Sequence, residues 1–141
     1  MKLLTVDQMR SIETAADASG HIFAQMMELA GSAVARVIQD RLAVSGKRIL
    51  LLIGPGNNGG DGLVAARVLK DAGADIGIYL LKSRDDELIN ALRERNVFIA
   101  SLPDDRGLRF LHLWLSNCDL IVDALLGTGT IRSISGDLAK L

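Results

Sequence analysis

The segment that most constrains the fold of this chain is a glycine-rich stretch between an apolar run and a helix-like pattern. Residues 49–53 are all Ile or Leu, residues 54–62 contain five glycines, and residues 63–69 are mostly apolar at helical spacing. Glycine permits positive φ and removes the Cβ that would hold a ligand away from the backbone. A helix that begins after such a loop offers N–H groups that have no partner inside the helix. We therefore predict a strand, a ligand-binding loop and a helix, in this order.

Alternating strand and helix patterns continue along the rest of the chain. The predicted strands are 49–53, 76–81, 97–100 and 119–125, and the predicted helices between them are 60–73, 85–95 and 105–116. Strands separated by helices favour a parallel sheet with right-handed crossovers. The predicted fold class is therefore α/β, a three-layer αβα sandwich with a Rossmann-like, mostly parallel sheet.

Two further helices are predicted before the first strand. Thr5 and Gln8 have capping-box spacing at the start of one, which ends near Gly20. The other carries its apolar residues on one side and ends near Gly46. Each helix has one apolar face, which we expect to cover the sheet or to meet a partner subunit.

Composition limits the function classes that the chain supports. It has 141 residues, enough for a single domain, and its 16 Lys and Arg nearly balance 17 Asp and Glu, which disfavours nucleic-acid binding. One cysteine, Cys118, cannot form a disulfide within the chain and fits a cytoplasmic protein. Charge precedes any long apolar stretch, so no membrane association is expected. Residues 135–141 resemble the opening of a helix, and we expect the domain 1–141 to be incomplete at its C-terminus.

The glycine loop also fits the motif of dinucleotide-binding dehydrogenases, so that class has to be weighed. Gly54, Gly56 and Gly59 satisfy G-x-G-x-x-G between a strand and a helix. However, the second predicted strand ends in Lys82-Ser83-Arg84 instead of the acidic residue that binds the ribose of NAD, and this segment could at best suit a 2′-phosphate. Asp61, expected in the first turn of the helix, would compete with a pyrophosphate for the same amides. The sequence therefore disfavours a conventional dehydrogenase.

Side-chain oxygens gather at the predicted carboxyl edge of the sheet. Asn57, Asn58 and Asp61 lie in the glycine loop, and Asp123 lies within the apolar run 120–125. A carboxylate there is costly unless a cation or hydrogen-bond donors meet it. Asn58 and Asp123 together offer two hard oxygen ligands for an alkali or alkaline-earth ion. The alternative is that Asp123 caps the turn that follows its strand.

Four segments together resemble a known family. Residues 54–62, 65–69 and 122–129 look like the YjeF N-terminal domain, the NAD(P)H-hydrate epimerase. Residues 26–31 resemble the signature of that family's second helix, with Leu29 where a polar residue is more usual. The resemblance spans nearly the whole chain, but the family's later Asp-x-Pro-Ser-Gly segment, which provides a further Asp for the substrate and a Ser for the ion, has no match here.

The resemblance implies a repair enzyme, an isomerase that interconverts the R and S epimers of hydrated NADH and NADPH. A fused or separate ATP- or ADP-dependent dehydratase then restores the cofactor, and the epimerase is expected to form a homodimer through its N-terminal helices. By matching position, Asn58 and Asp123 would bind K⁺, and Asp123 is the candidate catalytic residue. The residues expected to contact the hydrated dinucleotide are Asn57, Asn58, Gly59, Gly60, Asp61, Gly127, Thr128, Gly129, Thr130, Ile131, Arg132 and Ser133.

A non-catalytic reading stays open beside the enzymatic one. YjeF-like domains also serve as dimerisation or scaffold modules, and an intact glycine loop without the later signature suits that role. His21 and His112 lie apart in sequence from the glycine loop and from the loop 127–133 that follows the fourth predicted strand, and they are expected to have surface or packing roles.

Overall fold

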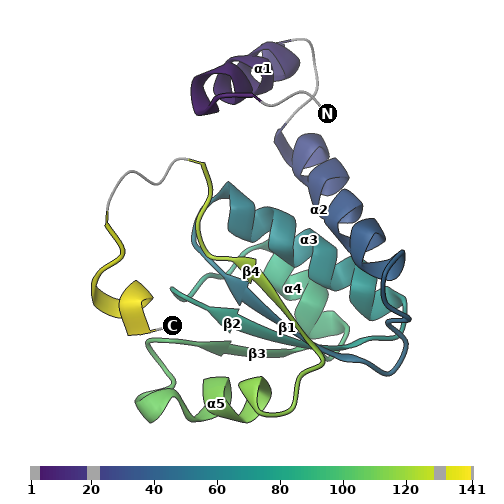
Figure 1. Cartoon of the computed structure of the whole chain (residues 1–141), viewed down its shortest axis with the longest axis vertical. Helices are drawn as coiled ribbons and strands as arrows, with labels where there is room; N and C mark the ends of the chain where they lie inside the picture. The colour runs from purple at the N-terminus through teal and green to yellow at the C-terminus, as the bar shows by residue number, and fades with distance from the viewer. Residues whose placement is uncertain (1–3, 19–22, 129–132, 141) are drawn as a thin grey trace.

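The computed structural model describes residues 4–18, 23–128 and 133–140, which form an α/β fold (Figure 1). The helices are α1 (Val6–Ala18), α2 (Phe23–Gln39), α3 (Asn57–Asp71), α4 (Glu87–Glu94) and α5 (Arg109–Leu115), with short 3₁₀ helices at Arg106–Leu108 and Gly136–Lys140. The strands are β1 (Arg48–Ile53), β2 (Asp75–Leu80), β3 (Phe98–Ser101) and β4 (Leu120–Ala124). The predicted fold class is confirmed.

The four strands form one parallel sheet in the order β3-β2-β1-β4. Ile53, the last residue of β1, pairs with Leu80 on one side and with Ala124 on the other. The chain therefore winds outward from β1 in one direction and then returns to add β4 on the other side. This reversal places a switch point between β1 and β4, at the carboxyl ends of the strands, where ligands bind in sheets of this kind.

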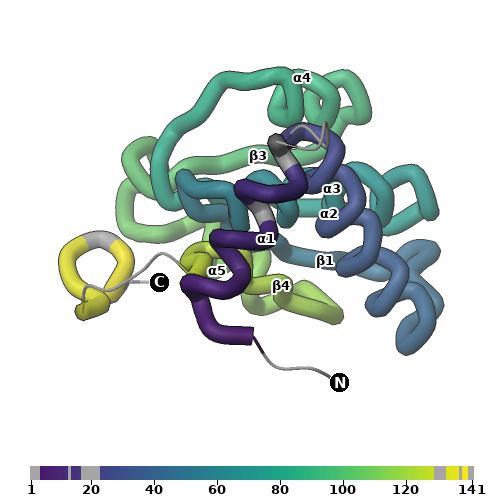
Figure 2. The backbone as a smooth tube through the Cα atoms, turned by 90° about the horizontal axis from the view of Figure 1, so that it is seen from above, coloured from purple at the N-terminus to yellow at the C-terminus, as the bar shows by residue number. Residues whose placement is uncertain are grey.

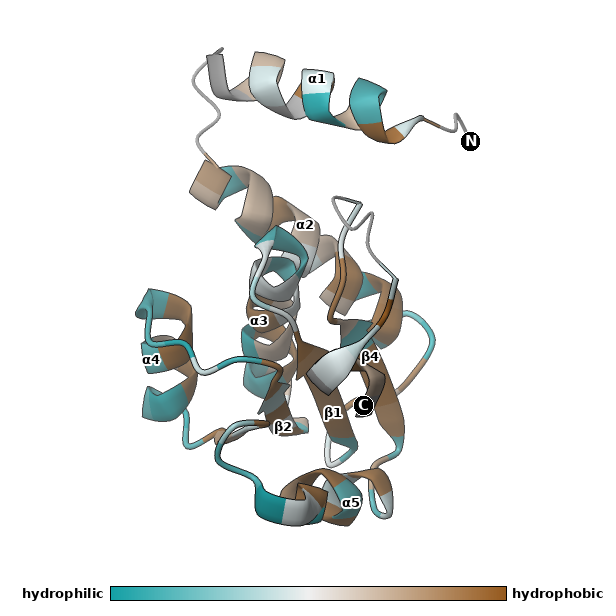
Figure 3. Cartoon of the chain, turned by 90° about the vertical axis from the view of Figure 1, so that its left-hand side faces the viewer, coloured by the Kyte–Doolittle hydropathy of each residue, from teal (hydrophilic) through white to brown (hydrophobic). Residues whose placement is uncertain are grey.

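Each face of the sheet has its own apolar cluster. Ile49, Leu51 and Ile53 of β1 point into the larger cluster, with α3 and α4. Leu50 and Tyr79 point to the opposite face and pack with Leu111 and Trp114 of α5. The strands are the most hydrophobic part of the molecule, whereas α4 is hydrophilic on the side away from the sheet (Figure 3). This alternation within one buried strand explains why residues 49–53 are all large and apolar.

The two N-terminal helices differ in how they join the sandwich. Helix α2 packs on α3, where Ala35 is fully buried and Glu28 forms an ion pair with Arg67. Helix α1 stands apart from the layers, above the ends of β1 and β4 (Figures 1 and 2). The capping box that was predicted at its start is confirmed, because Gln8 N donates to Thr5 Oγ1 and Thr5 N donates to Gln8 Oε1, at 3.2 and 2.9 Å. Among the described residues, no helix has the length and apolar character needed to span a bilayer.

Three predicted helix boundaries are wrong. Helix α2, which was predicted to end near Gly46, ends at Gln39. The helix after the glycine loop begins at Asn57 rather than at residue 60. The helix predicted over 105–116 is broken, because Gly107 and Leu108 have φ of 71° and 54°, and α5 begins only at Arg109. The four strands agree with prediction to within one residue, since their apolar runs are bounded by charged or turn residues.

A buried carboxylate holds the start of α5. Asp105, which is 4% exposed, accepts hydrogen bonds from Phe110 N, from Leu111 N and from the Tyr79 hydroxyl at 3.0 Å. Burial acts to raise the pKa of Asp105, but these donors outweigh it and hold the pKa below its usual value. Burial and then the bond to Asp105 raise the pKa of the Tyr79 phenol. Tyr79 therefore stays protonated and acts as a donor.

This arrangement predicts an acid-sensitive fold. Because the pKa of Asp105 is lower in the folded state, its contribution is present above the unfolded pKa, about 3.9, and is lost as the pH falls through the folded value. Asp105→Asn places an amide against N–H donors, and we expect it to cost about 2 kcal/mol at pH 7. Urea unfolding at pH 7 and pH 3 measures both effects, with the exposed Asp40→Asn as the control. Equal pH profiles for wild type and Asp105→Asn would contradict this role.

Candidate functional site

The glycine loop delivers the open end of α3 to the carboxyl edge of the sheet. Gly56 is the N-cap residue, with φ −92° and no side-chain cap, and Gly60 N donates to Gly56 O at 3.2 Å. The N–H groups of Asn57, Asn58 and Gly59 precede this bond and have no partner within the helix. Such N–H groups, together with the helix dipole, favour an anion.

The loop after β1 and the turn after β4 are fastened to each other. Asn58 Nδ2 donates to Leu126 O at 2.9 Å, and Gly54 N donates to Ala124 O at 3.0 Å. Within the turn, Leu125 N donates to Asp123 Oδ1 at 2.9 Å. The side chains of Asn58 and Asp123 are thus bonded to adjacent residues of one turn, which places them around the same corner of the molecule.

A cavity of about 530 Å³ opens between these two segments. The glycine loop forms one wall, the turn after β4 forms another, and α1 covers it from a third side. The described residues that line it are Met9, Arg10, Pro55, Gly56, Asn57, Asn58, Gly59, Asp61, Leu125, Leu126, Gly127 and Thr128. The two segments that the resemblance assigns to the dinucleotide, 57–61 and 127–133, therefore contribute described residues to one cavity. A volume of this size is typical of small-molecule sites.

The structure brings together about half of the predicted binding residues. Asn57, Asn58, Gly59, Asp61, Gly127 and Thr128 all line the cavity. Gly60 is buried behind it, against Met27 of α2. Gly129, Thr130, Ile131 and Arg132 lie outside the described residues, and Ser133 is exposed. Their assignment as contacts of the hydrated dinucleotide stays a prediction.

Two interpretations of acidic residues need correction. Asp61 stands after the first turn of α3, because the helix begins at Asn57. It therefore does not occupy the terminal amides, and one of the two reasons given for disfavouring a dehydrogenase is removed, while the absence of an acidic residue at 82–84 remains. Asp123 was expected to be costly within an apolar run, but it is exposed, because its side of β4 is left uncovered by α5. The bond from Leu125 N agrees with the capping alternative for Asp123, and binding of an ion there stays a prediction.

The structure also adds lining residues that the sequence did not indicate. Met9 and Arg10 come from α1, far in sequence from both loops. The sequence marked this helix by the capping box at Thr5 and by one apolar face, but nothing in its pattern says which side faces the loops. Tertiary placement alone reveals their position.

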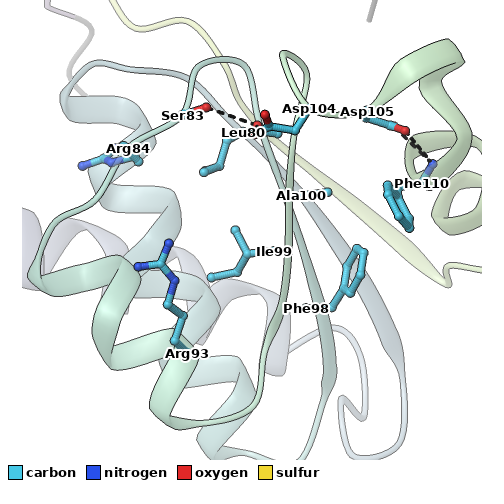
Figure 4. A pocket seen from close by; sticks show the side chains of 11 residues that line it. Leu80, Ser83, Arg84, Arg93, Phe98, Ile99, Ala100, Asp104, Asp105 and Phe110 are labelled. Atoms are coloured by element: carbon cyan, nitrogen blue, oxygen red, sulfur yellow. Dashed lines mark hydrogen bonds between the residues drawn. The ribbon is translucent and has the colours of Figure 1, made fainter.

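A second hollow, of about 260 Å³, lies at the edge strand β3 (Figure 4). Arg93 of α4 and Phe110 of α5 stand on opposite sides of the strand, with Phe98 and Ile99 between them. Arg93 Nη1 is engaged with Asp85 Oδ1 at 2.7 Å, and Asp105 caps α5. The charged groups named here therefore serve the fold.

The fold and the larger cavity together define a class. The chain is a doubly wound α/β domain whose ligand site combines a glycine-rich loop, an open helix N-terminus and a turn across the switch point. The model of the family described as YjeF-related protein N-terminus matches residues 23–141, and the chain belongs to this family.

Comparisons with individual proteins agree. The chain is 40% identical, over 96% of its length, to an NAD(P)H-hydrate epimerase of Rhodobacter capsulatus, and 46% identical over 65% of its length to that of Yarrowia lipolytica. It is 34% identical, over its whole length, to a bifunctional NAD(P)H-hydrate repair enzyme of Thermofilum pendens. It spans 66%, 39% and 28% of these three relatives. The crystal structure of yeast ynu0 matches with a TM-score of 0.80 and 30% identity, over 96% of this chain and 60% of the yeast chain.

Proposed function

We propose that the chain acts as an NAD(P)H-hydrate epimerase, converting between the R and S epimers of hydrated NADH and NADPH. The observation that carries this proposal is the single cavity shared by Asn57, Asn58, Asp61 and the turn after β4. Relatives named for this activity match 96% and 65% of the chain. The open amides at the start of α3 suit the negative pyrophosphate of a dinucleotide.

Epimerisation requires only that the C6–O bond of the hydrated nicotinamide ring breaks and that water adds again to C6. The C6–O bond breaks, the hydroxyl leaves with a proton as water, and the ring nitrogen stabilises the cation that remains. Water then adds to the opposite face and releases a proton. A carboxylate next to C6 can hold that proton and stabilise the cation. Asp123 does not line the cavity itself but stands just before the lining residue Leu125, whose N–H donates to Asp123 Oδ1. It is our candidate, because among the described residues no hydrogen bond is found at Oδ2.

We also propose that Asn58 and Asp123 hold K⁺ next to the substrate. The oxygen ligands that these side chains offer fit a monovalent ion. Asn58 donates from Nδ2 to Leu126 O, so its side-chain oxygen stays available to an ion. Within the described part of the chain, no group of three or more His, Cys, Asp or Glu is placed to hold a metal. An ion bound by an amide, one carboxylate and backbone carbonyls would supply positive charge and fix the turn after β4.

Partners follow from the same proposal. A dehydratase specific for one epimer would consume the product, either as a separate protein or as part of one chain, as the name of the bifunctional relative indicates for that protein. A homodimer through α1 and α2 would cover apolar residues that are 40–69% exposed: Val6, Met9, Ile12, Phe23 and Leu29. The single cysteine fits a cytoplasmic location.

The exposed apolar faces of α1 and α2 also favour a second candidate, a non-catalytic dimerisation or scaffold module. The two candidates differ in ligand binding. An epimerase binds hydrated NADPH or NADP⁺ in the cavity, whereas a scaffold needs only the helix surfaces.

Ligand-dependent stability tests the enzymatic proposal. NADP⁺ at a hundred times its dissociation constant should stabilise the chain by about 2.7 kcal/mol, which raises Tm by several degrees. Hydrated NADPH should also stabilise the chain, and its two epimers should interconvert. Chromatography that separates the R and S forms measures this exchange. Adenosine, which lacks the pyrophosphate and the nicotinamide, is the control. A dimer that neither binds NADP⁺ nor exchanges the epimers would support the scaffold instead.

A further inference from the structure

The charge of the cavity raises a question that the described parts of the two loops do not answer. Among the described residues that line it, only Arg10 and Asp61 are charged. A dinucleotide brings a pyrophosphate with two negative charges, and Asp61 opposes them. The amides at the start of α3 offer partial positive charge only. A full positive charge in this cavity has to come from α1 among the residues that the structure describes.

Arg10 is placed and available for that task. It lies in the first half of α1, next to Met9, and both side chains line the cavity opposite the glycine loop. Its ion pair is with Asp7 on the same helix, with Nη1 to Oδ1 at 3.9 Å. The two side chains are 58% and 94% exposed, so this contact is long and solvated and holds the guanidinium weakly.

The position of α1 fits a covering element better than a structural one. It stands apart from the sandwich at the end of the molecule where the loops after β1 and β4 lie (Figures 1 and 2). Its residues Met9 and Ile12 are 40% and 51% exposed, so the sheet gains little buried surface from it. A guanidinium on such a helix can adjust to a ligand at small cost to the fold.

We propose that Arg10 binds the pyrophosphate of the dinucleotide across the cavity from the N-terminus of α3. This inference rests on the proposed function, because it assigns one more residue to the same substrate. The planar guanidinium makes two parallel hydrogen bonds to phosphate oxygens, while the N–H groups of Asn57 to Gly59 approach from the opposite side. Helix α1 is therefore a part of the substrate site.

The test measures binding of NADP⁺ to the full chain and its variants by calorimetry. Arg10→Ala should weaken binding at least about tenfold, as expected for a charge-assisted phosphate contact. Arg10→Lys keeps the positive charge but not the planar guanidinium that makes two parallel hydrogen bonds. Its affinity for NADP⁺ should therefore lie between those of the wild type and Arg10→Ala. Loss of the contact should also flatten the dependence of the dissociation constant on salt, which a purely structural role would not do. Alanine is a good helix former, so α1 should persist in Arg10→Ala.

The matched control is Arg41→Ala, which removes an exposed arginine just beyond α2, near the amino end of β1. It should bind NADP⁺ like the wild type. If the wild type binds NADP⁺ and Arg10→Ala binds it equally well with the same salt dependence, the role of Arg10 is wrong and the proposed function stands. If the wild type binds neither NADP⁺ nor hydrated NADPH, both proposals are wrong.

Discussion

Replacing Gly54 by alanine should destabilise the chain by at least about 3 kcal/mol. A Cβ at Gly54 would lie well under 3.0 Å from the backbone oxygen of Leu125, and backbone atoms on both sides of this contact are fixed by the pairing of β1 with β4. Relief requires β1 and β4 to separate at the switch point. Because Gly54 N also donates to Ala124 O, that separation breaks the bond that fastens the two segments.

Urea unfolding followed through the single tryptophan, Trp114, measures this loss. For a domain of this size, 3 kcal/mol corresponds to a fall in Tm of roughly 10 °C. Since the cavity is built on the same contact, NADP⁺ binding should also disappear in Gly54→Ala at temperatures where the variant is still folded.

Gly56→Ala is the matched control two residues away. No atom lies within 4 Å of a Cβ placed at Gly56, and its φ of −92° suits any residue. Its cost should be at most about 1 kcal/mol, the difference between Gly and Ala as an N-cap residue. Equal losses at Gly54 and Gly56 would show that general flexibility of the loop, and not the close approach to Leu125, makes glycine necessary.

The parts of the fold that sequence could predict are those in which local pattern and burial agree. The run 49–53 predicts β1 because a strand covered on both faces needs apolar residues throughout. The glycine loop and Asp123 could be assigned to one edge because parallel strands end on the same side of a sheet. The structure confirms this with the bond between Asn58 and Leu126 O.

The parts that sequence could not predict depend on what each element meets in space. Gly107 and Leu108 take positive φ, and Asp105 accepts from the amides of Phe110 and Leu111 beyond this break, an arrangement that the helical pattern over 105–116 does not reveal. Asp123 follows the alternation of a buried strand but is exposed, because no described element covers its side of β4.

Asp123→Asn should lower epimer interconversion at least about a hundredfold, the usual size of a general acid–base contribution. The amide keeps a side-chain oxygen that can accept from Leu125 N, so the turn after β4 should stay in place. What it loses is the negative charge and the ability to hold a proton at Oδ2. The measurement is the rate at which the full chain interconverts the R and S epimers of hydrated NADPH. Asp40→Asn, which changes an exposed carboxylate, is the control.

The two readings of Asp123 separate in this variant. If Asp123 only caps the turn, Asp123→Asn keeps both its Tm and its exchange rate, whereas Asp123→Ala loses the bond from Leu125 N and falls in stability by about 1 kcal/mol. If Asp123 takes part in the chemistry or holds the ion, Asp123→Asn keeps its Tm and loses exchange. The hundredfold loss should then persist at saturating substrate, because a group that acts on the transition state lowers kcat and not only affinity. Near-normal turnover in Asp123→Asn would remove Asp123 from the reaction and leave its bond to Leu125 as its role.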